Sequence, residues 1–475
     1  MSTLNVHISR APSGLGYRWR SSYWFATFTV MLGILVDLLA CTIIIPVMPF
    51  HLEQLGYRRV SALTGWLLFA YVSSSYYLPT PPIAVFSERY NTRRMPLIIG
   101  LLLLVGSQVM LMEAPTYAVM CVARILQGIS SAMVWTVGLA LICDATPEKL
   151  LGGQLGIAMS GLSIGSLIGP AAGGALFTQF GYRGPFIFVI AWTVVDLIAR
   201  LLIIERKEAF VYGVDPQEVD KSENQGKEMS INPNSGPRDQ SLVNVEESDT
   251  RMTLNVPHVV DKPRNPSKIS ILVIFLELTK SSRALVAVIL TFAYGVGKLI
   301  QEPTLPLHLQ DVWGLNSVKV GLVFLASVVP TLSTALTGWY SDKKGPEWAA
   351  FACLILGLPW SVVLILKKSL ALFVVAFAIQ KFFASGILSP ITAELARVSQ
   401  GIEGVGYAHV YGVFNIAFGV GAAVGPLVGG QMYDNLTNGW LAVCLLVTSL
   451  IVLCILLSAC FIGSDPLVKK LWKRR

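Results

Sequence analysis

Three ionisable residues lie inside long apolar stretches of the sequence, where their side chains could take part in chemistry: Asp37, Arg124 and Glu302. A charged carboxylate at the centre of a membrane costs at least about 2.5 kcal/mol, so it should face a polar cavity or a partner. Such a carboxyl group can bind and release a proton. Arginine stays charged and needs an acid, carbonyl oxygens or a polar cavity. We therefore predict that Asp37 is a proton or cation site, that Glu302 is a second protonation site and that Arg124 faces a polar cavity.

A structural role is the alternative for each of these charges. Asp37 could be a buried acid that hydrogen-bonds a neighbouring helix, and Arg124 could reach the headgroup region with its long side chain. Asp196 and Arg200 are four residues apart and can pair on one helical face. We interpret that pair as structural.

Polar side chains at helical spacing accompany the charges. Arg124, Gln127 and Ser131 fall on one face of a helix with 3.6 residues per turn. Lys298 and Glu302 are four residues apart and can form an ion pair in the membrane interior, or Lys298 could instead neutralise an anionic substrate. The residues that we expect to line a substrate cavity are Gln127, Ser131, Tyr294, Lys298, Gln301 and Asn415.

The elements that position these residues are predicted to be membrane-spanning helices. The chain has 475 residues, of which 54% are hydrophobic and 13% charged, whereas soluble domains contain about 25% charged residues. Apolar runs of about 20 residues are long enough to cross a bilayer. They indicate an all-α membrane protein with twelve transmembrane helices, near 23–45, 62–86, 95–112, 116–142, 155–177, 184–204, 283–306, 318–338, 348–366, 370–392, 406–430 and 439–462.

The composition also excludes several function classes. The net charge of +8 arises mainly from Lys and Arg at span ends, so it does not indicate a nucleic-acid partner. No His/Cys/Asp cluster has metal-ligand spacing and no nucleophile motif is present, so we expect no enzyme, metal site or cofactor. The seven cysteines lie in or beside apolar spans, and we expect no disulfide framework.

Charge also predicts the orientation of the spans. Lys and Arg concentrate on one side of a twelve-span arrangement, which places both termini in the cytosol. The sequon Asn435-Leu436-Thr437 then lies outside, so Asn435 is a candidate glycosylation site. We expect a monomer in the lipid bilayer of the plasma membrane rather than of a vacuole or vesicle.

The chain divides into two halves joined by a polar linker. The predicted parts are a cytosolic tail at 1–21, a six-helix bundle at 22–204, a linker at 205–282, a second six-helix bundle at 283–463 and a basic tail at 464–475. The linker is charged and poor in large apolar residues, so we expect disorder apart from a short interfacial helix near its end.

Two motifs recur in the two halves. GLSIGSLIGPAAGG at 161–174 returns as AFGVGAAVGPLVGG at 417–430, which is 256 positions later. PVMPFHL at 46–52 returns as PTLPLHL at 303–309. Repeats in the same order at nearly the same offset predict two pseudo-symmetric six-helix bundles, an architecture known among transporters.

The glycines of the first motif recur at every fourth position, a spacing that lets helices approach closely. The added Gly-Pro pair and the duplication favour a bendable hinge and seal between the bundles over packing alone. The residues are Gly161, Gly165, Gly169, Pro170, Gly173 and Gly174, and then Gly421, Gly425, Pro426, Gly429 and Gly430.

A charged loop is also repeated. AVFSERYNTRR at 84–94 is matched by GWYSDKKG at 338–345. The repetition favours an ion-paired cytosolic gate over a basic loop at the membrane surface. The gate residues would be Glu88, Arg89 and Arg93 in the first copy, and Gly338, Asp342 and Lys343 in the second.

These motifs resemble those of the major facilitator superfamily, specifically its drug:proton antiporter branch with twelve spans. The first glycine motif is similar to that branch's fifth-span antiporter motif. Arg124 and Gln127 resemble the fourth-span motif whose arginine the family associates with proton coupling. The charged loops resemble the loop motif after the second span, but Glu88 and Asn91 replace the family's Asp and Gly, which implies a weakened gate.

The stretches around the three ionisable residues resemble the vesicular monoamine and acetylcholine transporters. That group's second-span lysine corresponds to Val72 here, and its acids in the tenth and eleventh spans correspond to Ser385 and Asn415. The resemblance therefore implies a fungal-type exporter of a drug, toxin or secondary metabolite rather than a carrier of cationic amines.

The function that the resemblance implies is secondary active transport: proton-coupled antiport that exports a small organic molecule by alternating access. Proton-coupled uptake or facilitated diffusion is the first alternative, disfavoured by the complete glycine motif and by the missing sugar-porter signature after the sixth span. A receptor or sensor on the same fold is the remote alternative. It would require a structured soluble domain, whereas the linker is polar.

Overall fold

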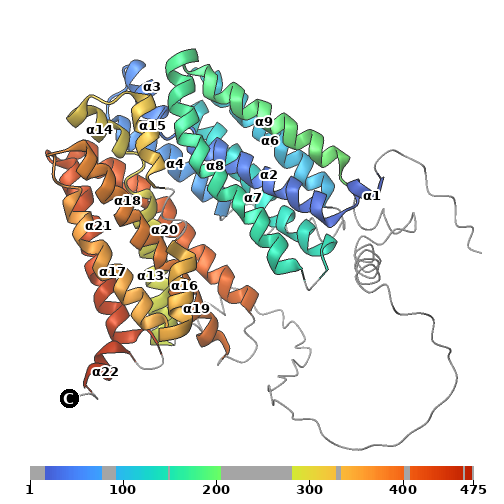
Figure 1. Cartoon of the computed structure of the whole chain (residues 1–475). Coiled ribbons are helices and arrows are strands. Elements are labelled where there is room, and N and C mark those ends of the chain that lie inside the picture. The colour runs from blue at the N-terminus through green and yellow to red at the C-terminus, as the bar shows by residue number, and fades with distance from the viewer. Residues whose placement is uncertain are drawn as a thin grey trace, which may run out of the picture.

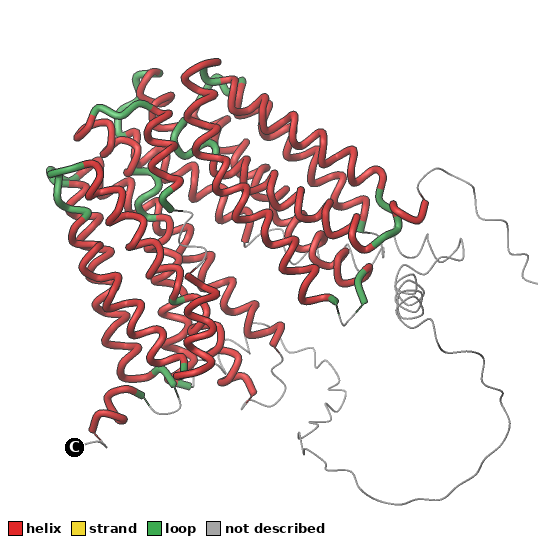
Figure 2. Tube along the Cα trace, in the orientation of Figure 1, coloured by secondary structure: helices red, strands yellow, loops and turns green. Residues whose placement is uncertain are grey.

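The computed structural model describes residues 17–76, 93–147, 150–204, 281–327, 333–400, 407–463 and 466–472. All regular elements in these segments are helices, and no strand occurs in them (Figure 2). Residues 205–280 of the predicted linker, which include its interfacial helix, and the gate residues Glu88 and Arg89 lie outside the described residues. The last two residues of the predicted linker, Ser281 and Ser282, instead begin the first helix of the second half.

Each half is a series of helices. The first contains α1 (Tyr17–Arg20), α2 (Tyr23–Thr42), α3 (Met48–Gln54), α4 (Val60–Tyr76), α6 (Arg94–Met112), α7 (Tyr117–Ala145), α8 (Leu151–Phe180) and α9 (Arg183–Leu202). The second contains α13 (Ser282–Leu299), α14 (Leu305–Trp313), α15 (Ser317–Leu325), α16 (Ser333–Lys344), α17 (Pro346–Val363), α18 (Leu370–Gly386), α19 (Leu388–Gln400), α20 (Tyr407–Asn435), α21 (Gly439–Phe461) and α22 (Leu467–Trp472).

Ten helical segments in the described part are long and apolar enough to cross a membrane. The second and eighth of the twelve predicted spans are described only in part. The helix α4 ends where the undescribed segment 77–92 begins, and α15 and α16 flank the undescribed segment 328–332. The structure therefore agrees with an all-α protein of two six-span halves.

The first span of each half is interrupted at a repeated proline motif. The break between α2 and α3 contains Pro46, and the break between α13 and α14 contains Pro303. Proline has no backbone N–H to continue the helix, which explains why both spans are divided at the same place. The second break carries Glu302.

The helices of the two halves form two separate groups (Figure 1). The groups meet at the end that carries α3, α14 and α15, and they diverge toward the end that carries α1 and α22. Across the boundary, α15 packs against α8 and α4 packs against α20. A small apolar cluster with Tyr71, Val72, Ala422 and Ala423 at its centre also joins the halves.

Within each half, the repeated glycines bring two backbones together. A Cβ atom at Gly161 of α8 would overlap the carbonyl oxygen of Met31 in α2, and one at Gly421 of α20 would overlap that of Phe292 in α13. Contacts of the same kind occur at Gly165, Gly173, Gly425 and Gly429, whereas a Cβ atom at Gly169 would overlap the Thr42 hydroxyl oxygen. Larger side chains would separate these helix pairs.

The last glycine of each motif contacts the other half instead. A Cβ atom at Gly174 would overlap the carbonyl oxygen of Ser317 in α15, and one at Gly430 would overlap that of Ser61 in α4. The two serine hydroxyl groups continue the symmetry. Ser61 Oγ donates to the carbonyl oxygen of Pro303 at 3.0 Å, and Ser317 Oγ donates to that of Pro46 at 2.7 Å. The repeated glycine helices thus lie on the boundary between the halves.

Candidate functional site

Asp37 lies in the middle of α2 and is only 1% exposed. Its Oδ2 atom accepts hydrogen bonds from Ser131 Oγ at 2.7 Å and from Trp135 Nε1 at 2.9 Å, both on α7. The hydroxyl group of Tyr71 on α4 donates to Ser131 Oγ at 3.3 Å. The buried Oδ1 atom has no hydrogen-bond partner in the described part of the chain. This carboxyl group therefore connects three helices and keeps one oxygen available to a proton.

Arg124 on α7 is completely buried, which excludes the alternative that it reaches the headgroup region. Its Nη1 atom donates to Gln127 Oε1 at 2.7 Å, and its guanidinium group lies 5.3 Å from the centre of the Tyr71 ring. Among the described residues it forms no ion pair, and its Nε and Nη2 atoms have no hydrogen-bond partner. The cation is held by one amide and one aromatic ring.

The second half places a different set of charges beside the boundary. Glu302 lies in the break after α13, whereas Lys298 is in the last turn of that helix and is exposed. The predicted ion pair between them is wrong, since no such pair occurs in the described part. The four-residue spacing aligns two side chains only on a continuous helix, and α13 ends at Leu299.

Lys381 on α18 contacts the last turn of α13, which directly precedes the break that holds Glu302. Its Nζ atom donates to the carbonyl oxygens of Lys298 at 3.1 Å and of Gly297 at 3.4 Å. Lys381 was not among the predicted site residues. One signal was present, because Lys381 follows Arg124 by 257 positions, the offset of the repeated proline motif.

An aromatic group that spans both halves adjoins these charges. The Phe418 ring on α20 lies 6.0 Å from the Tyr76 ring on α4 and 5.7 Å from the Tyr294 ring on α13. Lys298 Nζ lies 5.8 Å from the Phe418 centroid and 6.0 Å from that of Tyr294. Tyr294 and Lys298, both predicted cavity residues, are therefore neighbours in the structure.

Cys41 lies between the two sets of charges. It is one turn after Asp37 on α2, is half-buried, and packs against the apolar cluster that joins the two halves. Cys41 therefore lies at the boundary, beside the predicted proton site of the first half. All seven cysteines are free thiols.

The other predicted cavity residues differ in exposure. Gln301 is buried, and neither atom of its amide group has a hydrogen-bond partner in the described part of the structure. Asn415 is exposed on α20, three residues before Phe418. On a helix, residues three apart share a face, so Asn415 and Phe418 lie on the same side of α20.

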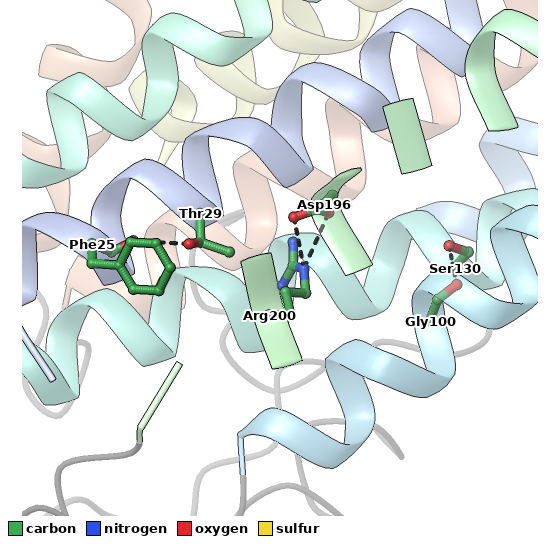
Figure 3. A network of polar contacts seen from close by, with 6 residues as sticks. All are labelled: Phe25, Thr29, Gly100, Ser130, Asp196 and Arg200. Carbon is green, nitrogen blue, oxygen red and sulfur yellow. Dashed lines mark hydrogen bonds and ion pairs between the residues drawn. The ribbon is translucent and has the colours of Figure 1, made fainter. Parts of the chain in front are cut away.

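Asp196 and Arg200 form a buried ion pair on α9, as the four-residue spacing predicted. Arg200 Nε lies 3.1 Å from Asp196 Oδ2, and Figure 3 shows the two side chains facing each other. A Cβ atom at Gly33 of α2 would overlap Arg200 Nη2, so α2 accommodates the guanidinium group by lacking a side chain there. The pair joins α9 to α2 and is structural.

Of the predicted gate, the described part contains Arg93, Gly338 and Lys343. Arg93 Nε lies 2.9 Å from Asp144 Oδ2, which connects the beginning of α6 to the end of α7. Lys343 Nζ lies 4.0 Å from the centre of the Trp339 ring on the same helix. The gate itself remains a prediction, because Glu88, Arg89 and the side chain of Asp342 lie outside the description.

The candidate glycosylation residue Asn435 is the last residue of α20 and is exposed. Its Nδ2 atom donates to the carbonyl oxygen of Gln431 at 2.9 Å.

Two pseudo-symmetric groups of membrane-spanning helices with ionisable side chains at their boundary define a transmembrane transporter rather than an enzyme. The model of the Major Facilitator Superfamily matches residues 15–278 and 287–472, so the chain belongs to this family.

Similar proteins are transporters as well. The chain is 26% identical over 450 residues to the MFS-type transporter ppzB of Metarhizium rileyi (strain RCEF 4871), covering 89% of this chain and 92% of that protein. It is 24% identical over 380 residues to the synaptic vesicular amine transporter of Bos taurus, covering 79% of this chain and 62% of the relative. A bacterial homologue of the human lysosomal transporter Spinster, solved in an inward-facing, unoccupied conformation, shares the fold with a TM-score of 0.66 and 16% identity, covering 92% of this chain and 96% of the other.

Proposed function

We propose that the protein is a secondary active transporter that exchanges protons for a small organic molecule and exports that molecule by alternating access. The observation that carries the proposal is Asp37. This carboxyl group is buried in the first half, has two hydrogen-bond donors on one oxygen and, among the described residues, none on the other. Ionisable groups inside membrane spans mark proton and ion pathways.

Proton binding at Asp37 would change its hydrogen bonds. The charged carboxylate only accepts, whereas the protonated form also donates one hydrogen bond. The bonds to Ser131 and Trp135 are therefore strongest when Asp37 is deprotonated. The contacts of Asp37 with α7 thus differ between its two protonation states. A conformation that changes these contacts binds the proton with a different affinity, and this difference lets proton binding shift the conformational equilibrium.

The boundary between the halves supports alternating access. The halves touch through two symmetric sets of contacts, at Gly174 with Ser317 and at Gly430 with Ser61. With cytosolic termini, the diverging end that carries α1 and α22 faces the cytosol, and this conformation is inward-facing (Figure 1). We place the protein in the plasma membrane, with the gate of the charged loops on the cytosolic side.

Uptake by proton symport is the second candidate, and one observation favours it. Glu302 experiences the positive charges of Lys381 and Lys298. Protonation of Glu302 would leave these cations without its charge and favour an anionic substrate, which would then move in the same direction as the proton. The direction of gradient-driven movement separates the two candidates.

The test uses proteoliposomes with an acidic interior and three naphthalene probes of permanent or near-permanent charge state: naphthalene-1-sulfonate, naphthalene-1-sulfonamide and a trimethylammonium derivative. Antiport predicts that a probe accumulates inside against its gradient, and symport predicts that a preloaded probe is driven out. If the movement of all three probes does not depend on the proton gradient, both antiport and symport are contradicted.

The variant Asp37→Asn is expected to lose gradient-driven accumulation by about tenfold or more while probe exchange without a gradient persists. Glu113→Gln is the control, because Glu113 is an exposed acid whose only described partner is the exposed Arg183. An Asp37→Asn protein that accumulates the probe normally would remove Asp37 from the mechanism.

A further inference from the structure

We infer that Tyr71 is the positioning residue that connects the proton site at Asp37 to the cation Arg124. The inference rests on the proposed antiport and identifies the contact through which proton binding and substrate binding influence each other. Tyr71 was not among the candidate residues in the sequence, because a tyrosine in an apolar span fits simple packing equally well.

Tyr71 has contacts on two sides. Its hydroxyl group donates to Ser131, and Ser131 in turn donates to Asp37 Oδ2, so two hydrogen bonds point in series toward the carboxylate. Hydrogen bonds in series polarise and strengthen one another. The face of its ring lies 5.3 Å from the guanidinium carbon of Arg124. Among the described residues, this ring and the Gln127 amide are the contacts that hold the arginine.

Two donor atoms of Arg124 are available to a ligand in this arrangement. Its Nε and Nη2 atoms are buried and donate to no partner in the described residues. A buried N–H group without an acceptor costs about 1–3 kcal/mol. A substrate oxygen that accepts from these atoms would remove that cost. The orientation of the guanidinium group therefore influences substrate binding.

Proton binding at Asp37 weakens the bond from Ser131, because a neutral acid is a poorer acceptor than a carboxylate. The Ser131 hydroxyl group then turns to another acceptor, and the Tyr71 hydroxyl loses the polarised chain that holds it. A shift of the ring changes the cation–π contact and moves Arg124 away from its substrate-binding orientation. Deprotonated Asp37 thus favours substrate binding and protonated Asp37 opposes it, which is the condition for exchange.

The close contact between α4 and α7 gives Tyr71 a direct connection to the helix that carries Arg124. A Cβ atom at Gly128 would overlap Ser74 Oγ and come within 2.5 Å of the carbonyl oxygen of Tyr71. The backbones of α4 and α7 are therefore in contact at Tyr71 itself, and a movement of this residue is transmitted to α7 one turn from Arg124.

The test is Tyr71→Phe, which keeps the ring against Arg124 and removes the hydroxyl group. The probe is whichever of the three naphthalene compounds the wild-type protein moves fastest. Because the ring then no longer responds to the proton on Asp37, we expect the apparent substrate affinity in exchange without a gradient to stop changing with pH, and accumulation driven by the proton gradient to fall by about tenfold or more. A merely structural tyrosine would leave this pH dependence in place.

Tyr117→Phe is the matched control. It also removes one tyrosine hydroxyl group, which donates to the carbonyl oxygen of Leu63 on α4, but Tyr117 makes no described contact with Asp37 or Arg124. We expect gradient-driven accumulation to be retained. A Tyr71→Phe protein that remains coupled, or a Tyr117→Phe protein that loses coupling equally, overturns the inference.

The wild-type result separates this inference from the proposed function. A wild-type protein that ignores the proton gradient, or that moves none of the probes, overturns the antiport and this inference with it. A coupled wild type together with a coupled Tyr71→Phe protein leaves the antiport in place and removes Tyr71 alone.

Discussion

In both halves of the molecule, a glycine-rich helix packs against the first helix of its own half through backbone contacts, α8 on α2 and α20 on α13. The polar groups near these contacts differ. The first half buries Asp37 and Arg124 in a hydrogen-bonded group, whereas the second half presents an exposed Lys298 and a half-buried Lys381 beside Glu302. The repeated elements thus set the packing that both halves share, and the polar residues that are not repeated distinguish the two halves.

Stacked histidines show the same distinction on a smaller scale. His51 stacks on Tyr182 in the first half, and His308 stacks on Trp440 in the second. The histidine is repeated by the proline motif, but its aromatic partner is not the same residue type. The fold preserves the geometry of the pair while its chemistry differs.

The buried ion pairs provide the largest expected difference between the halves. Arg200 and Asp196 are both almost completely buried, whereas Arg283 is 35% exposed beside the buried Glu394. Asp196→Asn leaves an unpaired buried guanidinium group, and we expect a loss of about 3–5 kcal/mol in unfolding free energy. Arg283→Gln removes the cation from the buried Glu394, which keeps a hydrogen bond from the backbone N–H of Gly463, and we expect a smaller loss of about 1–3 kcal/mol.

Unfolding by SDS titration in mixed micelles measures both losses. Glu113→Gln, which breaks an exposed pair, is the reference and should change stability by less than about 1 kcal/mol. Equal losses for Asp196→Asn and Arg283→Gln would show that burial does not distinguish the two pairs.

A methyl group added at a glycine contact should reduce transport equally in the two halves. Gly161→Ala and Gly421→Ala each place a methyl group against a carbonyl oxygen, and overpacking costs about 1–3 kcal/mol. We expect transport to fall by more than the amount of folded protein, because the helices separate at the hinge. Gly156→Ala is the control on α8, since a Cβ atom there meets nothing within 4 Å.

Transport of the naphthalene probe, normalised to folded protein from size-exclusion chromatography, checks this expectation. A strong effect at Gly161 with none at Gly421 would show that only the first glycine motif is a hinge. Normal transport by both variants would return the motifs to simple packing.

Much of the fold could be predicted from the sequence because its causes are local or periodic. Apolar length predicts the spans, and the repeated glycine and proline motifs predict the two halves. The pair of Asp196 and Arg200 was predicted correctly because both residues lie on one uninterrupted helix. The pair of Lys298 and Glu302 was predicted wrongly because α13 ends between them.

The candidate site was less predictable, since its contacts join helices that are far apart in the sequence. Tyr71 lies 53 residues before Arg124, and Trp135 lies 98 residues after Asp37. Nothing in the local pattern distinguishes an aromatic residue that holds a cation or donates to an acid from one that only fills space. The charged residues themselves could be predicted, because a charge inside an apolar span is costly and marks a functional or paired side chain.

The smallest expected effects concern the two serines at the boundary. Ser61 Oγ and Ser317 Oγ each donate across it to a proline carbonyl oxygen, at 3.0 Å and 2.7 Å. Ser61→Ala and Ser317→Ala should each destabilise the closed end by about 1 kcal/mol, the net contribution of one hydrogen bond. Because the two bonds are symmetric, the effects should be equal, and they should add if the end opens as one unit. Spin labels at the exposed Leu55 and Lys319 report the fraction of open molecules by their distance distribution. If only one of the two variants changes the fraction of open molecules, the two hydrogen bonds have the same geometry but contribute unequally to the stability of the closed end. The opening would then depend mainly on one of the two contacts.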